Sequence, residues 1–197
     1  MNSAYGAIGN QYFRYYDKAI AEGITKSGQL SIRWIENKLN KYLNNVLKTD
    51  DDYVIASDTD SVYLTLDKLV TKTIKSDNAL SKTINFLDKV ASESIEPYIT
   101  KSYDELKQYT NAFANKMFMK REVIADKGIW VAKKRYILNV WNSEGVSYKE
   151  PKLKMMGIEA VKSSTPAICR QKIKDALELI MTSDEKELNK FVINFRE

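Results

Sequence analysis

Residues 53–66 place two short apolar stretches on either side of an Asp-Thr-Asp-Ser turn, and this is the strongest local constraint on the fold. The stretches Tyr53–Ala56 and Val62–Leu66 are rich in residues that favour β-strands. Aspartate, threonine and serine are favoured in turns. The pattern predicts a β-hairpin with apolar arms and an acidic tip.

Helical periodicity surrounds this hairpin. Apolar residues recur at steps of three, four and one between Ile20 and Leu47, and a second helical stretch runs from Ala79 to Asn111. Pro97 interrupts the second stretch, so a break or a new helix start is expected there. The first segment, Met1–Asp17, is rich in Gly, Asn and Tyr and is expected to contain turns.

The second half of the chain contains clustered strand signals and then returns to helix. The expected strands are Phe118–Ala125, Ile129–Trp141 and Tyr148–Lys154, with a turn at 142–145. A helix is then expected to begin with Pro166, capped by Ser164 or Thr165, and to run to Met181, and a last helix follows Ser183. Because the strands cluster instead of alternating with helices, we predict an α+β fold with an antiparallel sheet and flanking helices.

The composition excludes several kinds of chemistry. The 197-residue chain has no histidine and a single cysteine, Cys169. Serine-histidine-aspartate triads, cysteine-histidine pairs and histidine-ligated zinc are excluded, and any metal would be a hard cation held by carboxylates. The net charge of +5 suits a polyanionic partner such as nucleic acid, but proteins without such a partner often carry a similar charge.

The chain carries no signal for a membrane or for export. No apolar stretch approaches membrane-spanning length, and residues 1–10 lack the basic and apolar regions of a signal peptide. We therefore expect an intracellular protein that resides in the cytoplasm.

Asp58 and Asp60 stand two residues apart at the tip of the expected hairpin. Crowded carboxylates repel each other, and divalent cations remove that conflict. In phosphoryl-transfer enzymes, two Mg²⁺ ions activate a 3′-hydroxyl and stabilise the leaving pyrophosphate. Ordinary turn chemistry explains the same residues without a metal.

Two further segments supply candidate residues. Asn2–Gly6 places small residues around one tyrosine, which permits close approach of backbone or ligand, or forms a simple turn. Glu122, on an expected strand, is a candidate only if its side chain points toward Asp58 and Asp60.

The stretch Lys133-Lys134-Arg135-Tyr136 joins three cations to an aromatic ring. On a continuous strand, Lys134 and Tyr136 would face one side and Lys133 and Arg135 the other. Cations beside an aromatic ring suit contact with nucleic-acid phosphates and grooves. A solvated basic strand is the alternative.

Taken in order, the motifs NSAYG, SDTDSVY and KKRY make this chain resemble the family B replicative DNA polymerases, in the version found in T-even-type bacteriophages. The connecting stretches GQLSIRWIENKLNKYLN, MKREVI and LKMMGIEAVKSSTP fit the same family, so the resemblance covers essentially the whole chain. It implies the end of the fingers motif and the entry to the palm over 1–17, a palm domain over 18–162 and the start of the thumb over 163–197.

The resemblance also implies roles for individual residues. Three of them match positions beside the nascent base pair or the incoming nucleotide: Asn2, Tyr5 and Gly6. Asp60 matches an aspartate that ligates the catalytic metal, Asp58 its more peripheral partner, and Glu122 a palm acid close to the metals. Residues that match DNA-binding positions are Thr59, Lys133, Lys134, Arg135 and Tyr136.

The implied activity is template-directed nucleotidyl transfer to a primer 3′-hydroxyl by a two-metal mechanism. Mg²⁺ would be the cofactor, and primer–template DNA, deoxynucleoside triphosphates and the rest of the polymerase would be the partners. The sequence lacks the family's DxxSLYPS segment, whose aspartate bridges both metals, the fingers residues that bind the triphosphate, and the exonuclease domain. Lys120 and Ala4 stand where an aspartate and a leucine are usual.

We therefore expect a polymerase fragment, or one piece of a split polymerase, that is inactive alone. A non-catalytic nucleic-acid-binding module or accessory subunit is the alternative. A metal-dependent transferase that binds a nucleotide-sugar would need neither the NSAYG nor the KKRY motif.

Overall fold

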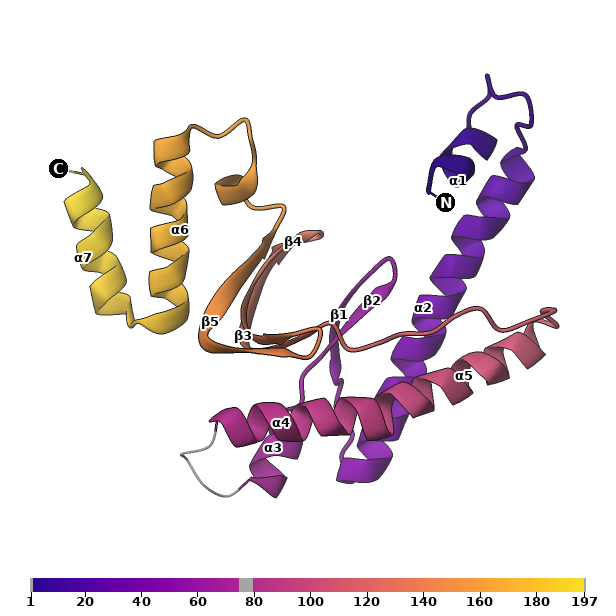
Figure 1. Cartoon of the computed structure of the whole chain (residues 1–197), viewed down its shortest axis with the longest axis horizontal. Coiled ribbons are helices and arrows are strands. Elements are labelled where there is room, and N and C mark those ends of the chain that lie inside the picture. Colours follow the sequence, from indigo (N-terminus) through magenta and orange to yellow (C-terminus); the bar gives the residue numbers. More distant parts are fainter. Residues whose placement is uncertain (1, 75–79, 197) are drawn as a thin grey trace. The chain divides into compact units, whose positions relative to one another are not determined.

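The computed structural model describes residues 2–74 and 80–196 and has the predicted α+β fold (Figure 1). Helices occupy both ends of the chain, and the strands form two antiparallel sheets. The chain divides into two compact units. The first comprises Met1–Thr83 and Lys89–Lys120, and the second comprises Ile84–Asp88 and Arg121–Glu197. None of the helices in the described ranges is long and apolar enough to cross a membrane.

The first unit is built around one long helix, α2 (Lys18–Leu47), which confirms the helix predicted from the periodicity. Asp17 caps its first turn, because a side-chain oxygen accepts a hydrogen bond from the backbone N–H of Ile20 at 3.0 Å. Lys48 ends the helix in the left-handed conformation, with φ of 54°.

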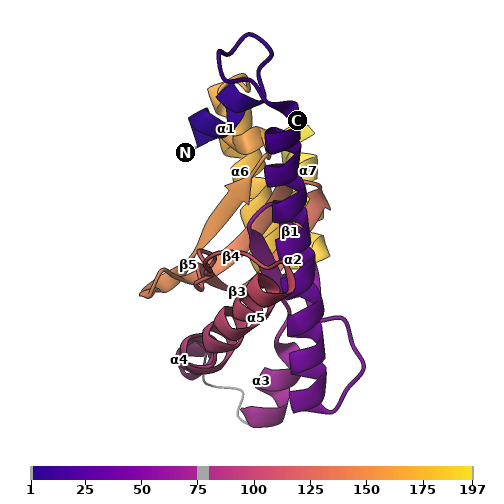
Figure 2. The ribbon, with the colours of Figure 1, turned by 90° about the vertical axis from the view of Figure 1, so that its right-hand side faces the viewer.

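A hairpin and two short helices flank α2. The hairpin consists of β1 (Val54–Asp58) and β2 (Ser61–Leu64), as predicted. It is followed by α3 (Asp67–Thr73), which lies beside the C-terminal end of α2 (Figure 2). Ahead of α2, residues 2–8 form α1 (Asn2–Ile8), a helix in a segment whose composition predicted turns. Contact with α2 stabilises this helix despite its helix-disfavouring Asn and Gly residues.

The helical stretch after residue 79 is continuous. It begins with α4 (Leu80–Val90), passes through a π-helical segment, η1 (Ala91–Ile95), and ends with α5 (Glu96–Tyr109). Pro97 lies in the first turn of α5, where its missing N–H is tolerated. The helical stretch is not broken at this proline, and what was predicted as a break or a new helix start corresponds to the change from η1 to α5 one residue before it.

The core of the first unit lies between α2 and α5. Ile35 and Leu39 of α2 are fully buried and pack against Ile95, Ile99 and Tyr103. On each helix these residues recur at four-residue intervals, so each helix turns one apolar face toward the other. Burial of a side chain of this size contributes about 1.5–3 kcal/mol. Apolar hairpin residues pack on the same core: Val54, Val62 and Leu64.

The second unit contains a three-stranded antiparallel sheet in the order β3–β4–β5 (Figure 1). Its strands are β3 (Val123–Ala132), β4 (Arg135–Ser143) and β5 (Val146–Met156). Five successive residues of the central strand, 136–140, are buried, so both faces of the sheet are covered there. Four of these five residues are apolar, as expected of a strand that is covered on both faces, and the fifth is Asn139.

One face of this sheet is covered by helix. Ile137 of β4 packs with Met181 of α6 (Ala167–Thr182) and with Ile158 and Ala160, which adjoin the short 3₁₀ helix η2 (Glu159–Val161). The last helix, α7 (Glu185–Arg196), follows Ser183 as predicted. Residues 163–197 thus share a compact unit with the sheet, and their assignment to a thumb, like that of 18–162 to a palm, stays a prediction.

The strand that was predicted over Ile129–Trp141 is interrupted. A turn at Lys133 and Lys134 divides it, so that its two parts belong to β3 and β4. The predicted alternation of side chains along residues 133–136 is therefore wrong. The turn is absent from the sequence signals because Lys134 adopts φ of 60°, a conformation that turn prediction reserves for Gly, Asn or Asp.

Other boundaries differ by less. The strand expected over Phe118–Ala125 begins only at Val123, and the turn expected at 142–145 is confined to Glu144 and Gly145. Pro166 precedes α6 as its N-cap instead of being its first residue, with ψ of 143°, and no side chain caps this helix.

Candidate functional site

The tip of the β1–β2 hairpin carries the candidate carboxylates. Asp58 pairs with Ser61, so Thr59 and Asp60 form a two-residue turn, and Thr59 takes φ of 55° as such a tight turn requires. The Asp58 carbonyl oxygen accepts hydrogen bonds from the Asp60 backbone N–H at 2.6 Å and from Ser61 Oγ at 3.0 Å. Thr59 Oγ1 donates to Asp58 Oδ1 at 3.0 Å. These bonds fix both aspartates on one turn, with Asp60 exposed and Asp58 half-buried.

Two asparagines of α2 hold the loop that leads into the hairpin. Asn40 Oδ1 accepts hydrogen bonds from the backbone N–H groups of Tyr53 at 2.8 Å and Val54 at 3.1 Å. Asn44 Oδ1 accepts from the N–H of Asp51 at 2.8 Å, and its amide nitrogen donates to the Asp51 carbonyl oxygen at 2.8 Å. These hydrogen bonds attach the start of β1 to α2. The hairpin that carries the acidic tip is therefore held at its base by this helix.

An ion pair joins the same loop to α3. The Lys68 ammonium donates to Asp51 Oδ2 at 2.5 Å. This hydrogen bond lowers the pKa of Asp51 and raises the pKa of Lys68. Asp51 therefore contributes to the scaffold that supports the hairpin.

The hairpin tip suits a hard divalent cation. Mg²⁺ is usually bound through one or two carboxylates, while water and substrate phosphates supply its other oxygen ligands. Asp58 and Asp60 offer such a pair at the end of a rigid turn. Over residues 2–74 and 80–196 there is no group of three or more Asp, Glu, Cys or His side chains that could hold a metal.

The candidate nucleotide-binding residues lie on α1. Tyr5 is partly exposed, and its hydroxyl forms a 2.8 Å hydrogen bond with Thr25 Oγ1 on α2. Gly6 follows in the same helix, and a Cβ atom there would have no atom within 4 Å apart from its chain neighbours and the backbone of its own helix. Asn2 begins the helix, but its side chain lies outside the described part of the chain.

Glu122 lies immediately before β3 and belongs to the second unit, whereas Asp58 and Asp60 belong to the first. Its carboxylate forms an ion pair with Lys154 of β5. Its carbonyl oxygen accepts a hydrogen bond from the backbone N–H of Glu144 at 2.7 Å. Both contacts hold Glu122 against the end of the three-stranded sheet.

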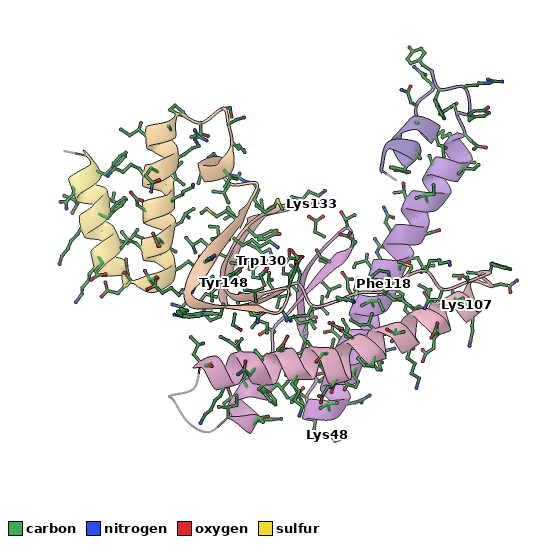
Figure 3. The ribbon with its side chains drawn as sticks, in the orientation of Figure 1. Lys48, Lys107, Phe118, Trp130, Lys133 and Tyr148 are labelled. Atoms are coloured by element: carbon green, nitrogen blue, oxygen red, sulfur yellow. The ribbon has the colours of Figure 1, made fainter. Side chains whose placement is uncertain are left out.

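The turn between β3 and β4 presents Lys133 to solvent (Figure 3). Arg135, the first residue of β4, donates from Nη2 to both carboxylate oxygens of Glu159, at 2.7 and 2.5 Å. Tyr136 is 6% exposed, and its ring lies 6.4 Å from that of its cross-strand partner Trp130. The four residues of this motif thus occupy different environments.

Glu159 is the centre of a small charged cluster. Its pKa is lowered by a hydrogen bond from its own backbone N–H, by the Lys162 ammonium at 3.1 Å and by the charge of Arg135. It begins η2, whose Ala160 is buried in the core of the second unit. The carboxylate is therefore ionised at neutral pH, and it projects from a segment whose next residue is buried in the core.

Aromatic and basic side chains also lie close to one another on the sheet. Lys152 Nζ lies 4.2 Å from the ring centroid of Tyr148 on β5. Trp130 lies on β3, near the turn that carries Lys133 (Figure 3). Cations beside aromatic rings are the side chains that proteins use to grip nucleic-acid backbones and bases.

The structure shows supporting residues that the sequence did not reveal. Asn40, Asn44, Gly157 and Glu159 each hold a segment that carries candidate site residues. Glu159 stands 24 residues from Arg135, and Asn40 stands 13 from Tyr53. No local pattern marks such partners, apart from a lone glycine that follows a strand.

Two curated relatives match this chain. The chain is 44% identical to the DNA-directed DNA polymerase of Escherichia phage RB69 over 195 residues, which cover 94% of this chain. It is 40% identical to the DNA-directed DNA polymerase of Enterobacteria phage T4 over 210 residues, which cover the whole chain. The matches span 22% and 23% of those relatives, so the chain spans less than a quarter of their length. No family model matches the chain.

Proposed function

Because this chain is similar over its whole length to one segment of phage DNA-directed DNA polymerases, we propose that it forms part of a template-directed DNA polymerase of family B. The single observation that carries the proposal is the Asp58–Asp60 pair at the tip of an apolar hairpin, in a chain with 40–44% identity to two polymerases. On this proposal the hairpin belongs to the palm, and residues 163–197 begin the thumb.

Asp60, with Asp58 beside it, is proposed to hold catalytic Mg²⁺. The cation would stabilise the negative charge that develops when a primer 3′-hydroxyl attacks a nucleoside triphosphate and pyrophosphate leaves. The hairpin contributes by fixing the backbone of the turn that carries the two carboxylates, through the hydrogen bonds to the Asp58 carbonyl oxygen. Glu122 is proposed as a further acid of the catalytic centre, on the basis of the resemblance.

The remaining candidates are proposed to bind substrates. Asn2, Tyr5 and Gly6 would lie beside the incoming deoxynucleoside triphosphate. Thr59 and the stretch Lys133–Tyr136 would contact primer–template DNA. The exposed Lys133 and the aromatic residues of the neighbouring strands support contact with a nucleic-acid backbone.

The rest of a polymerase is the proposed protein partner. The relatives are more than four times as long as the segment matched here. Several aromatic side chains of the first unit are highly exposed, and such side chains are typical of surfaces that another polypeptide covers: Tyr12, Tyr15, Tyr109, Phe113 and Phe118. The proposed location is the cytoplasm of the infected host cell.

Primer extension with Mg²⁺ and deoxynucleoside triphosphates tests the proposal. The chain alone is expected to be inactive, and the chain mixed with a polypeptide that carries the preceding part of the T4 polymerase is expected to extend a primer. Asp60→Asn should abolish extension in the mixture while the circular-dichroism spectrum stays unchanged. Asp50→Asn is the matched control, because Asp50 is an exposed aspartate of the loop that precedes the hairpin.

Each other outcome has a definite meaning. Extension by the chain alone would show that another carboxylate of this chain replaces the missing metal-bridging aspartate. Full activity of Asp60→Asn would show that the hairpin tip is not part of the catalytic centre. Binding of duplex DNA by a mixture that never extends a primer would favour the alternative function, a non-catalytic nucleic-acid-binding module, for which the basic β3–β4 turn is the supporting observation.

A further inference from the structure

The β3–β4 turn has a backbone conformation that its own sequence does not favour. Ala132 pairs with Arg135, so Lys133 and Lys134 form a two-residue turn. Tight hairpin turns of this kind usually contain glycine or asparagine, because their central residues require positive φ. Lys134 adopts φ of 60° with a full side chain. Contacts from outside the hairpin are therefore needed to hold this turn in one shape.

Gly157 supplies the first of these contacts. It has φ of 65° and follows the last residue of β5. A Cβ atom placed on it would lie 2.2 Å from the carbonyl oxygen of Lys134 and 3.1 Å from Cγ of Arg135. The backbone of residue 157 thus lies directly against the backbone of the turn, at a distance that no other residue type permits.

Glu159 supplies the second contact. One guanidinium nitrogen of Arg135 donates to both oxygens of its carboxylate. Ile158 and Ala160, on either side of Glu159, are buried in the core with Ile137. The carboxylate therefore projects from a segment that the core immobilises, and it holds the first residue after the turn.

We propose that Arg135 and Glu159 are positioning residues that, with Gly157, hold the Lys133–Lys134 turn in the shape in which its lysines bind DNA. This inference narrows the role proposed above for Arg135: its guanidinium contributes to DNA binding by holding the turn through Glu159 and not by contacting phosphate itself. Its charge is already compensated by Glu159, whereas Lys133 is exposed. This inference rests on the proposed function of the turn as a DNA contact.

Limited proteolysis tests the anchoring without any DNA. Trypsin cleaves after lysine, and a turn that is held in one shape resists cleavage. Glu159→Ala should raise the rate of cleavage after Lys133 and Lys134 severalfold, relative to cleavage after Lys116 in the first unit. The matched control, Glu150→Ala, removes an exposed glutamate from β5 and should leave that ratio unchanged. Equal ratios in wild type and Glu159→Ala would overturn the anchoring.

Duplex binding tests the consequence of the anchoring. Binding of a labelled primer–template to the chain is measured by fluorescence anisotropy at several salt concentrations. Each phosphate contact contributes about eightfold to affinity at 0.1 M salt and about 0.9 to the salt slope. If the anchoring holds, Glu159→Arg should weaken binding although it adds positive charge, and the double variant Arg135→Glu with Glu159→Arg should restore most of the affinity.

The opposite results separate the inference from the proposed function. If Arg135 grips phosphate directly, Glu159→Arg should bind more tightly and the double variant should stay weak, which would overturn the inference. Lys133→Ala tests whether the turn contacts DNA. Its affinity for the duplex should fall by the contribution of about one phosphate contact. Normal binding by Lys133→Ala, or no binding by the wild type, would show that this turn does not contact DNA. The proteolysis result alone would then show whether Glu159 anchors the turn.

Discussion

The indole Nε1 of Trp34 on α2 donates a hydrogen bond to the backbone carbonyl oxygen of Ser102 on α5, at 2.9 Å. The same ring stacks on Tyr109, with centroids 5.6 Å apart and planes inclined by 28°. Lys38 Nζ lies 5.1 Å from its centroid. A single side chain thus links the two helices that enclose the core of the first unit.

Replacing Trp34 should therefore destabilise the fold of the first unit. Trp34→Phe keeps most of the apolar contact but leaves the Ser102 carbonyl without this donor, so a loss of about 1 kcal/mol is expected. Trp34→Ala also removes the ring, and the expected loss is about 3 kcal/mol. Urea unfolding followed by circular dichroism measures both. Equal stability of the two variants would show that the hydrogen bond, and not the ring packing, dominates.

Asn40→Ala should loosen the base of the hairpin. Two backbone N–H groups, of Tyr53 and Val54, lose their acceptor, and the expected cost is about 2 kcal/mol. Asn40→Asp keeps an acceptor at the same place and should be closer to wild type, although it puts a second charge beside Asp52. Amide hydrogen exchange at residues 53 and 54 is the direct measurement. Protection that survives in Asn40→Ala would contradict the assigned role.

Gly128→Ala should disturb the ring of Trp130. A Cβ atom on Gly128 would lie 2.7 Å from two atoms of that ring and 2.9 Å from a methyl carbon of Leu138, so the ring must move. The expected cost is about 1–3 kcal/mol. In a Trp130→Ala background the same substitution should cost clearly less, and a double-mutant cycle measures the difference. Identical costs in both backgrounds would mean that the ring does not restrict this position.

Acid should destabilise the protein through three carboxyl groups. Hydrogen bonds from Lys68 and Lys38 lower the pKa of Asp51 and Glu105, and the backbone N–H of Glu159 together with Lys162 lowers that of Glu159. A lowered folded-state pKa contributes stability that is present above the unfolded-state pKa and is lost as pH falls through the folded-state pKa. The melting temperature should therefore decline below about pH 4.5. Lys38→Met should reduce this decline, and an unchanged acid profile would exclude the Glu105 contribution.

The elements with strong local signals were predicted from the sequence. The Asp-Thr-Asp-Ser turn between apolar arms predicts the β1–β2 hairpin, and a periodic apolar face predicts α2. The β3–β4 turn could not be found in this way, because Lys134 takes a left-handed conformation that depends on Gly157 and Glu159, which are distant from it in the sequence. The helix α1 was missed for a similar reason, since its stability depends on α2.

The candidate site shows the same division. Asp58 and Asp60 were found because they form a recognisable turn, and the assignment of Lys133–Tyr136 to DNA came from a motif. Neither the ion pair between Glu122 and Lys154 nor that between Arg135 and Glu159 could be predicted, because each joins residues that are far apart in the sequence. Local patterns identified the residues that could carry chemistry, and tertiary contacts determine how those residues are held.

The connectivity of the two sheets and of the α2–α5 core has a consequence for the order of folding. The strands β3, β4 and β5 pair with their immediate neighbours in sequence, so the three-stranded sheet forms by closing short loops. Trp34 and Ser102 are separated by 68 residues, so the core between α2 and α5 requires the closure of a long loop. Contacts between distant residues slow folding. The sheet should therefore acquire its protection early after dilution from denaturant, and the first unit should be the slower of the two to reach its native state.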